Sequence, residues 1–287
     1  MMPDADLKSL TEKLLALSKQ EIQIRYHTAE QPLAPTASRI GGRPAVPAGF
    51  EWPCYTGVSY SEPEPKTRPL SFLAQINLKE IAGLDEEHLL PESGVLSFFY
   101  ELDTMTWGFL PSDRGSARVY YFPDESALGC VDAPPELKEG NRLPELALEF
   151  RQRISLPSYE DYPGGEDMNA YDACGDRLWA SEDDWGEAAK LLGYPDVIQN
   201  SMEWECEALS RGYPQGSPED YAKISKEEKE DILEKSRDWT LLFQLSTVTS
   251  GDFELMFGDC GNIYFWIKKS DLAERRFQDC WLILQCG

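Results

Sequence analysis

The apolar run PLSFLAQI at residues 69–76 has a counterpart in DWTLLFQL at residues 238–245. Both runs are short and rich in the apolar and aromatic residues that form buried strands. Aligning them places Gln75 over Gln244, 169 positions later in the chain. The match predicts that one strand-containing unit occurs twice.

Three further pairs of segments match in the same order and extend this repeat. They are residues 94–100 with 261–267, residues 117–122 with 280–285, and Gly42-Arg43-Pro44 with Gly193-Tyr194-Pro195. A single β-rich unit would leave one apolar sheet face uncovered, and a second copy can cover it. We therefore expect an α+β fold made by internal duplication. Its two related β-rich halves pack as one compact body of mostly antiparallel sheet with a few peripheral helices.

This interpretation divides a single compact domain, residues 1–287, into three parts. They are an N-terminal half (1–125), an acidic connection or insertion (126–190) and a C-terminal half (191–287) that repeats the strand pattern. The connection carries one more predicted strand at residues 146–156, where apolar and polar residues alternate.

Helices are predicted at three places. The spacing of Leu7, Leu10 and Leu14 indicates an amphipathic helix over residues 4–25. Two more are predicted at residues 181–192 and 218–236, the latter opened by Ser217 and Pro218. Proline and glycine between residues 32 and 69 argue against a long helix or a central strand there. Near the end of the chain, residues 253–257 and 262–267 are predicted to form a hairpin.

The composition narrows the class of protein. The 51 acidic and 27 basic residues among 287 give a net charge of −24, which argues against a nucleic-acid or membrane-surface role and favours a basic or cationic partner. No membrane-spanning apolar run and no signal pattern occur. Seven scattered cysteines without a C-x-x-C pair indicate reduced thiols in the cytoplasm. No cofactor or metal is expected.

Six runs of the sequence resemble the YwqG-like family, a domain of unknown function (1963) found mainly in bacteria. They are GGRPAVPAGFEWP, PLSFLAQINL, LLPESGVLSFFY, LLGYPDVIQ, WTLLFQL and FGDCGNIYFWIKKSDL, which together cover about residues 39–285. The resemblance implies a mixed α and β protein of related halves in the cytosol, and no reaction. Members of the family have been proposed as immunity proteins beside bacterial toxins. The segment 158–187 is more acidic than the family leads us to expect.

Five residues are candidates for a small-molecule site. Gly42 and Arg43 either present backbone N–H groups and a guanidinium to an anion or form a tight turn. Gln75 and Gln244 lie among apolar residues, so each amide needs partners. They either bond the backbone across the two halves or line a shared pocket. Asp259 is either an acid, base or metal ligand on a turn, or bonds to its own turn.

The segment 159–187 is the candidate partner surface. It holds ten carboxylates against one base, Arg177, with tyrosines and tryptophans interleaved. Aromatic faces beside carboxylates suit cations. The candidate residues are Tyr162, Asp172, Trp179, Asp183, Asp184 and Trp185. The alternative is a solvated loop that its aromatic residues pin to the body.

Two functions remain open on these grounds. The favoured one is a non-enzymatic binding protein, in one form an immunity protein, that presents the acidic segment to a basic or cationic partner. The alternative is an enzyme of unknown reaction with a polar pocket between the halves, where Arg43, Asp259 and the two glutamines converge. Only two separate histidines, His27 and His88, occur, which argues against histidine-based catalysis.

Overall fold

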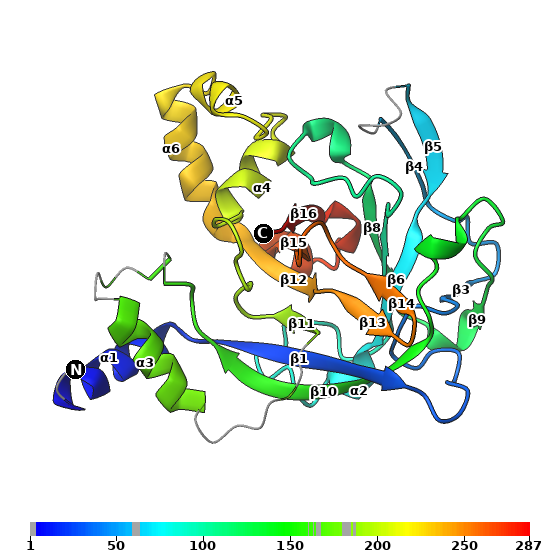
Figure 1. Cartoon of the computed structure of the whole chain (residues 1–287), viewed down its shortest axis with the longest axis horizontal. Coiled ribbons are helices and arrows are strands. Elements are labelled where there is room, and N and C mark those ends of the chain that lie inside the picture. Colours follow the sequence, from blue (N-terminus) through cyan, green and yellow to red (C-terminus); the bar gives the residue numbers. More distant parts are fainter. Residues whose placement is uncertain are drawn as a thin grey trace.

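A ten-stranded antiparallel sheet forms the body of the protein (Figure 1). The computed structural model describes residues 4–58, 64–159, 161–162, 164, 168–179, 185 and 188–287. From one edge to the other, the strands are β16 (Trp281–Gln285), β15 (Asn262–Lys268), β12 (Trp239–Leu245), β11 (Ala189–Leu192), β1 (Lys19–Thr28), β10 (Leu146–Ser155), β2 (Arg39–Ile40), β6 (Ser71–Asn77), β7 (Val95–Tyr100) and β8 (Ala117–Phe122).

Short sheets and helices surround this body. The two-stranded pairs are β3 (Ala45–Pro47) with β9 (Leu128–Cys130), β4 (Cys54–Gly57) with β5 (Lys66–Pro69), and β13 (Val248–Ser250) with β14 (Phe253–Leu255). The helices are α1 (Asp4–Leu17), α2 (Leu78–Ile81), α3 (Met168–Trp179), α4 (Glu203–Ser210), α5 (Pro218–Ala222), α6 (Lys226–Lys235) and α7 (Lys269–Ala273). The predicted class, mostly antiparallel sheet with a few helices, is confirmed.

The N-terminal arm of the sheet (β2, β6, β7 and β8) faces the C-terminal arm (β11, β12, β15 and β16) across one apolar core. Phe98 of β7 lies 4.4 Å from Phe243 of β12 and 5.3 Å from Phe265 of β15, measured between ring centroids. The edge of β16 is covered by the other arm, because the N–H of Leu284 donates to the carbonyl of Trp107 at 3.0 Å. The sheet is therefore nearly closed.

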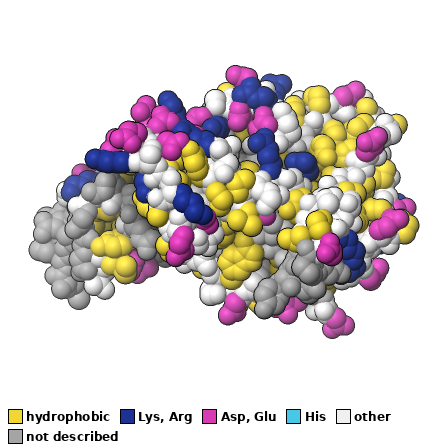
Figure 2. All heavy atoms as spheres, turned by 90° about the horizontal axis from the view of Figure 1, so that it is seen from above, with side chains coloured by type: hydrophobic (Ala, Val, Ile, Leu, Met, Phe, Trp, Pro, Cys, Tyr) yellow, Lys and Arg dark blue, Asp and Glu magenta, His cyan; other side chains and the backbone are white. Residues whose placement is uncertain are grey.

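Helices cover the C-terminal arm and the N-terminal end of the molecule. Helices α4, α5 and α6 lie together in Figure 1, and α4 packs Cys206 and Leu209 into a cluster with Trp239 and Trp266 of the sheet. Helices α1 and α3 lie side by side away from them, around Leu14 and Cys174. On the face seen in Figure 2, acidic and basic side chains are interspersed, and apolar side chains gather towards the end that carries β4 and β5.

Most predicted strands are confirmed. The runs predicted at residues 70–76, 94–100, 117–122 and 146–156 form β6, β7, β8 and β10, and the three strands of the C-terminal tail form β12, β15 and β16. Residues 253–257 do not pair with 262–267 as predicted, because β14 pairs with β13. The turn between the two runs does close, since the N–H of Gly261 donates to the carbonyl of Phe257 at 2.9 Å.

The first predicted helix is too long. It ends at Leu17, and β1 begins at Lys19 and pairs with β10 and β11. Ile22 and Ile24 point into the core in alternation with polar residues, a period of two that the leucine spacing upstream masked. Sheet pairing on both sides therefore overrides the helical pattern.

Other helix predictions also change. Residues 189–192 form strand β11 rather than the end of a helix, and residues 181–184 of that prediction lie outside the described residues. The helix of this region is α3, further upstream. The prediction over 218–236 becomes α5 and α6, because Ser225 caps a new helix through the N–H of Glu228. The proline-rich stretch does supply a central strand, β2, of only two residues.

Gly108 closes the gap between the two arms, and we expect its replacement by alanine to be costly. Its φ is +85°, and a Cβ there would lie 1.9 Å from the carbonyl oxygen of Leu282. Gly212 has a similar φ of +91° with open space around its Cβ position. Left-handed strain alone costs about 1–2 kcal/mol, so Gly212→Ala should lose about that much. Gly108→Ala should lose about 3–5 kcal/mol, because overpacking adds to the strain. Urea denaturation measures both, and equal losses would show that the close approach is not there.

Candidate functional site

The Gly42–Arg43 loop is a tight turn. Gly42 has a φ of +69°, and its N–H donates to the carbonyl of Leu143 at 2.9 Å. Arg43 is exposed, 3.8 Å from a carboxylate oxygen of Asp132. Because the glycine N–H is bonded within the chain, the contacts fit the turn interpretation rather than the anion-binding one.

The two buried glutamines are each fixed within their own half. Gln75 Oε1 accepts the N–H of Ala45 at 2.9 Å, and its Nε2 donates to carbonyls of residues 35 and 37. Gln244 Oε1 accepts the N–H of Asp196 at 2.9 Å, and its Nε2 donates to the Asp196 carboxylate at 2.6 Å. These hydrogen bonds neither cross between the halves nor meet in a shared pocket.

Asp259 lies apart from the other candidates. Its side chain is exposed, and its carbonyl accepts the N–H of the C-terminal Gly287 at 2.9 Å. Within the described part of the chain, no hydrogen bond or ion pair joins Arg43, Asp259 and the two glutamines to one another or to a shared partner.

The aromatic residues of the acidic segment contact the chain itself. Tyr162 is buried in a small cluster with Leu10 and Leu14. The guanidinium of Arg153 lies 4.4 Å from the ring centroid of Trp179. These contacts favour the interpretation in which aromatic residues pin the segment to the body.

Trp185 makes the same kind of contact further along the sheet. Its ring carries the guanidinium of Arg25 at 4.0 Å and that of Arg151 at 4.7 Å. Asp172 of α3 is exposed, whereas Asp183 and Asp184 lie outside the described residues. Of the predicted partner surface, the structure therefore describes one exposed carboxylate and three aromatic residues that face inward.

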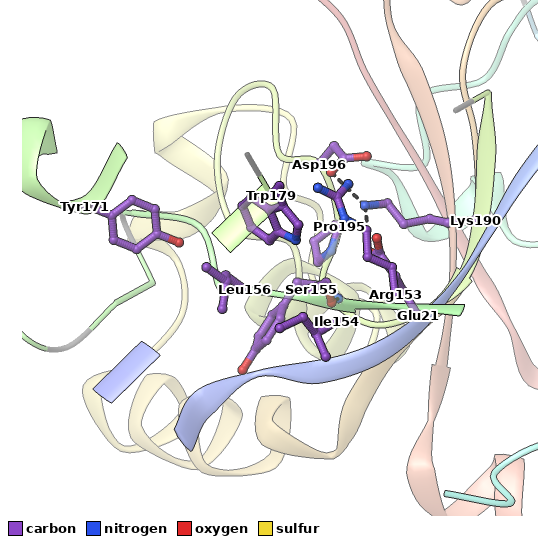
Figure 3. Close-up of a pocket in the computed structure, with 11 residues that line it drawn as sticks. Glu21, Arg153, Ile154, Ser155, Leu156, Tyr171, Trp179, Lys190, Pro195 and Asp196 are labelled. Atoms are coloured by element: carbon purple, nitrogen blue, oxygen red, sulfur yellow. Dashed lines mark hydrogen bonds and ion pairs between the residues drawn. The ribbon is translucent and has the colours of Figure 1, made fainter. Parts of the chain in front are cut away.

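A polar cluster that the sequence did not reveal lies on the outer face of β1, β10 and β11. The ammonium of Lys190 is 3.2 Å from Glu21 Oε2 and 2.7 Å from Asp196 Oδ1 (Figure 3). Lys190 and Glu21 are both buried. The cluster lines an open pocket of about 210 Å³ whose other walls come from β10, α3 and the loop after β11. The alternation Glu21-Ile22-Gln23-Ile24-Arg25 was the signal that could have shown this face.

Burial sets the electrostatics of this pocket. It raises the pKa of the Glu21 carboxyl, although the Lys190 ammonium beside it acts in the opposite direction. Burial likewise lowers the pKa of the nearby Lys19 ammonium. The protonation of the Glu21 carboxyl therefore depends on the charge of the Lys190 ammonium beside it.

A second ion pair with a buried cation lies on the other arm. Arg39 of β2 is 2.6 Å from Glu145 Oε2, and Arg39 is buried. In both places a glycine with positive φ follows closely. A Cβ on Gly42 would lie 2.8 Å from the Glu145 Cβ, and a Cβ on Gly193 would lie 2.7 Å from the Glu21 Cβ. Strands β2 and β11 are thus each followed by a tight turn whose positive φ and close packing only glycine can adopt.

Two searches of the described residues found nothing. Within it, no three His, Cys, Asp or Glu side chains gather in a group that could hold a metal ion. No described helix is both long and apolar enough to cross a bilayer. All seven cysteines are free thiols.

Comparison with known proteins gives one match. The model of the family described as Domain of unknown function (DUF1963) matches residues 38–286. These are nearly the same residues that carry the resemblance in the sequence. A search of the curated proteins found no match.

Proposed function

The chain belongs to the DUF1963 family, the YwqG-like domain of unknown function, and since that family names no reaction, we propose that this protein acts by binding. In this proposal it is a non-enzymatic interaction protein whose acidic segment, residues 159–187, receives a basic or cationic partner. Ten carboxylates against one arginine in that segment supply the long-range attraction. An immunity protein that blocks a basic toxin is one specific form, and it rests on the family alone.

One observation carries the proposal: this segment already holds guanidinium groups. Trp179 and Trp185 stack on three arginines of the chain's own sheet at 4.0–4.7 Å. The same chemistry, carboxylates beside aromatic faces, suits lysine and arginine side chains of a partner. Asp172 and Asp176 of α3 are exposed beside these contacts and are available for such a partner.

Charge reversal on α3 tests the proposal. We expect Asp172→Lys with Asp176→Lys to weaken binding of a fluorescently labelled oligolysine about tenfold, because two exposed attractions become repulsions. The matched control is Glu227→Lys with Glu234→Lys on α6, which makes the same change in net charge on a helix where Lys226 and Lys229 are interspersed. The control should weaken binding about twofold. Fluorescence anisotropy measures both.

Salt dependence gives the second readout. Raising salt from about 0.1 M to about 1 M shortens the Debye length from about 10 Å to about 3 Å, so wild-type binding should fade. Equal weakening in the two variants would mean that only net charge matters, and would remove the role given to this segment.

An enzyme remains the second candidate. The observation that favours it is the pocket at Lys190, where buried charges meet solvent at the junction of β1, β10 and β11. These side chains alone point to no particular reaction.

We also propose that the chain arose by internal duplication. The strand order is symmetric about β1 and β10, and the register shifts lie at Phe72/Ala74 and Leu241/Phe243, at the offset that the sequence alignment gives. Three further features occur once in each half. They are a glycine turn, an ion pair packed against that glycine, and a buried glutamine that accepts a backbone N–H. On this proposal β1 and β10 are equivalent, and each lies beside the short strand of the other copy.

A cytosolic location is the last part of the proposal. Seven free cysteines support it, because thiols persist in reducing compartments and pair in oxidising ones.

A further inference from the structure

A second pocket lies where β1 runs on past its shorter neighbour β11 (Figure 1). Ala189, the first residue of β11, pairs with Ile24, whereas β1 continues to Thr28 and there pairs, among the described strands, only with β10. The ends of β12 and β15 border the space left beside β1. The pocket measures about 540 Å³ and is open to solvent. That volume falls within the range of about 300–1,000 Å³ that is usual for small-molecule sites.

Seven residues line this pocket, and none of them is aspartate, glutamate, lysine, arginine or histidine. They are Tyr26 of β1, residue 188 before β11, residues 246 and 247 after β12, and residues 260–262 at the start of β15. An ion that entered would lose water without gaining an opposite charge, which is costly. The net charge of −24 further opposes anions. The lining therefore favours a neutral ligand.

Asn262 brings an oriented hydrogen-bond acceptor to the lining. The residue is 8% exposed, and its Nδ2 donates to the Tyr264 hydroxyl at 3.2 Å and to the carbonyl of Asp196 at 3.5 Å. These two bonds use both amide hydrogens and so orient the side chain. Its Oδ1 accepts no hydrogen bond from the described residues and is not closed off from solvent. A hydroxyl group of a ligand can donate to this oxygen.

Three hydroxyl groups complete the hydrogen-bonding set. Those of Ser246 and Thr247 make no hydrogen bond within the described part of the chain and are accessible to solvent. The Tyr26 hydroxyl accepts the N–H of Thr249 at 2.8 Å, which fixes the oxygen and leaves its proton to be donated. The pocket thus offers groups that donate, accept or do both, beside the Tyr26 ring and the methyl group of Ala188.

We propose that this pocket binds a small neutral saccharide. A hydroxyl group both donates and accepts hydrogen bonds, and a sugar carries several of them on an uncharged ring. The sugar hydroxyls donate to Asn262 Oδ1 and exchange hydrogen bonds with Ser246 and Thr247. None of the lining residues belongs to the segment 159–187, so this inference goes beyond the function proposed above.

Isothermal titration calorimetry on the full chain tests the proposal with defined probes. These are glucose, galactose and mannose, the N-acetylamino, amino and phosphorylated forms of each, and N-acetylalaninamide as a neutral molecule without hydroxyls. We expect at least one neutral sugar to bind with a Kd of about 1 mM or tighter. The amino and phosphorylated forms of that sugar should each bind about tenfold more weakly, because the lining has no opposite charge for them.

Two threonine variants locate the site. Thr247→Val removes the lining hydroxyl while keeping the shape of the side chain, and should weaken sugar binding about fivefold. Thr249→Val makes the same change two residues further on, at an exposed side chain outside the lining, and should leave the Kd unchanged. Ser246→Ala should weaken binding about as much as Thr247→Val does.

Thiol labelling locates the site without a substitution. Cys260 in the lining and Cys54 on β4 are both exposed. A saturating concentration of the sugar that binds should slow alkylation of Cys260 by iodoacetamide about fivefold, because most of the protein is then in the shielded, bound form. Cys54, followed in the same sample by mass spectrometry, should react at an unchanged rate.

Each contrary result overturns the inference. These results are the absence of binding by every neutral sugar, tighter binding of a charged form or of N-acetylalaninamide, equal effects of the two threonine variants, and equal slowing of the two cysteines. Thermal denaturation of each variant establishes that it is folded. The charge-reversed α3 variant should keep its sugar binding, so that a failure of the acidic surface and a failure of this pocket are separate results.

Discussion

Replacing Phe98 by alanine is expected to lower the free energy of unfolding by about 4 kcal/mol, because it leaves a cavity at the point where the two arms of the sheet meet. Phe98 is 0% exposed and lies against Phe243 and Phe265 of the other arm. Few atoms can move to fill the space, since β7 is bonded to β6 and β8 on either side. Urea denaturation followed by tryptophan fluorescence gives this value.

The matched control is Phe122→Ala at the edge of the sheet. Phe122 is half-buried on β8 and stacks on Tyr120 with centroids 6.1 Å apart. Its loss should cost about 1 kcal/mol, because solvent can occupy the space. If both variants lost the same free energy, the contact between the arms would not be the centre of the core.

Replacing Glu207 by alanine is expected to lower the free energy of unfolding by about 3 kcal/mol. The Glu207 side chain is 3% exposed and lies 2.8 Å from Lys268 Nζ and 2.7 Å from Arg211. It also accepts the indole N–H of Trp239 at 2.9 Å. Removing it leaves the buried Trp239 N–H and the Lys268 ammonium without this acceptor, while Arg211 keeps Asp231 at 2.5 Å. Leaving such partners behind is the costly way to break a buried network.

The pH dependence of stability gives an independent test of Glu207. Burial alone would raise the pKa of its carboxyl, but hydrogen bonds from Lys268, Trp239 and Arg211 outweigh it and hold the pKa below the ordinary value of 4.5. The carboxylate therefore stabilises the fold above about pH 4.5. That contribution disappears as the pH falls through the lower, folded-state pKa. Glu207→Gln should flatten this part of the stability profile.

The control for Glu207 is an exposed carboxylate in a simple ion pair. Glu230 of α6 lies 3.8 Å from Lys226, with both side chains exposed. Glu230→Ala should cost less than about 0.5 kcal/mol, since screened surface pairs contribute little. A Glu207 variant as stable as the Glu230 variant would contradict the network.

The sequence predicted the strands of both arms and the central strand β10 well, and it failed at two strands beside β10 and the C-terminal arm, β1 and β11. The runs that form β6, β7, β12 and β15 are apolar on both faces and bounded by turn residues, so their pattern reads directly. Residues 19–25 of β1 and all of β11 were predicted as helix because neither strand shows such a pattern. The first follows a leucine-spaced helix, and the second is only four residues long. Pairing with distant strands, which no local pattern records, decides both.

The same cause explains the candidate site. The glycine turn and the buried glutamines were found because their residue types stand out, and contacts then showed them bonded within their own arms. Lys190 and Glu21 were missed because both lie on strands that had been predicted as helices. Trp179 and Trp185 were recognised as cation-binding rings, but no pattern in the acidic segment points to arginines on β1 and β10 as the cations.

The position of β1 between β10 and β11 has a consequence for how the protein is made. Residue 21 of β1 pairs with residue 192, and residue 19 pairs with residue 155. A ribosome adding about 5–20 residues per second therefore releases β1 roughly ten to thirty seconds before its last neighbour exists. Until β10 is complete at residue 155, Ile22 and Ile24 have no strand to pair with, and β1 lacks its second neighbour until residue 192 exists. The first strand of the nascent chain is thus among the last to find its place, and such distant pairings make folding slow.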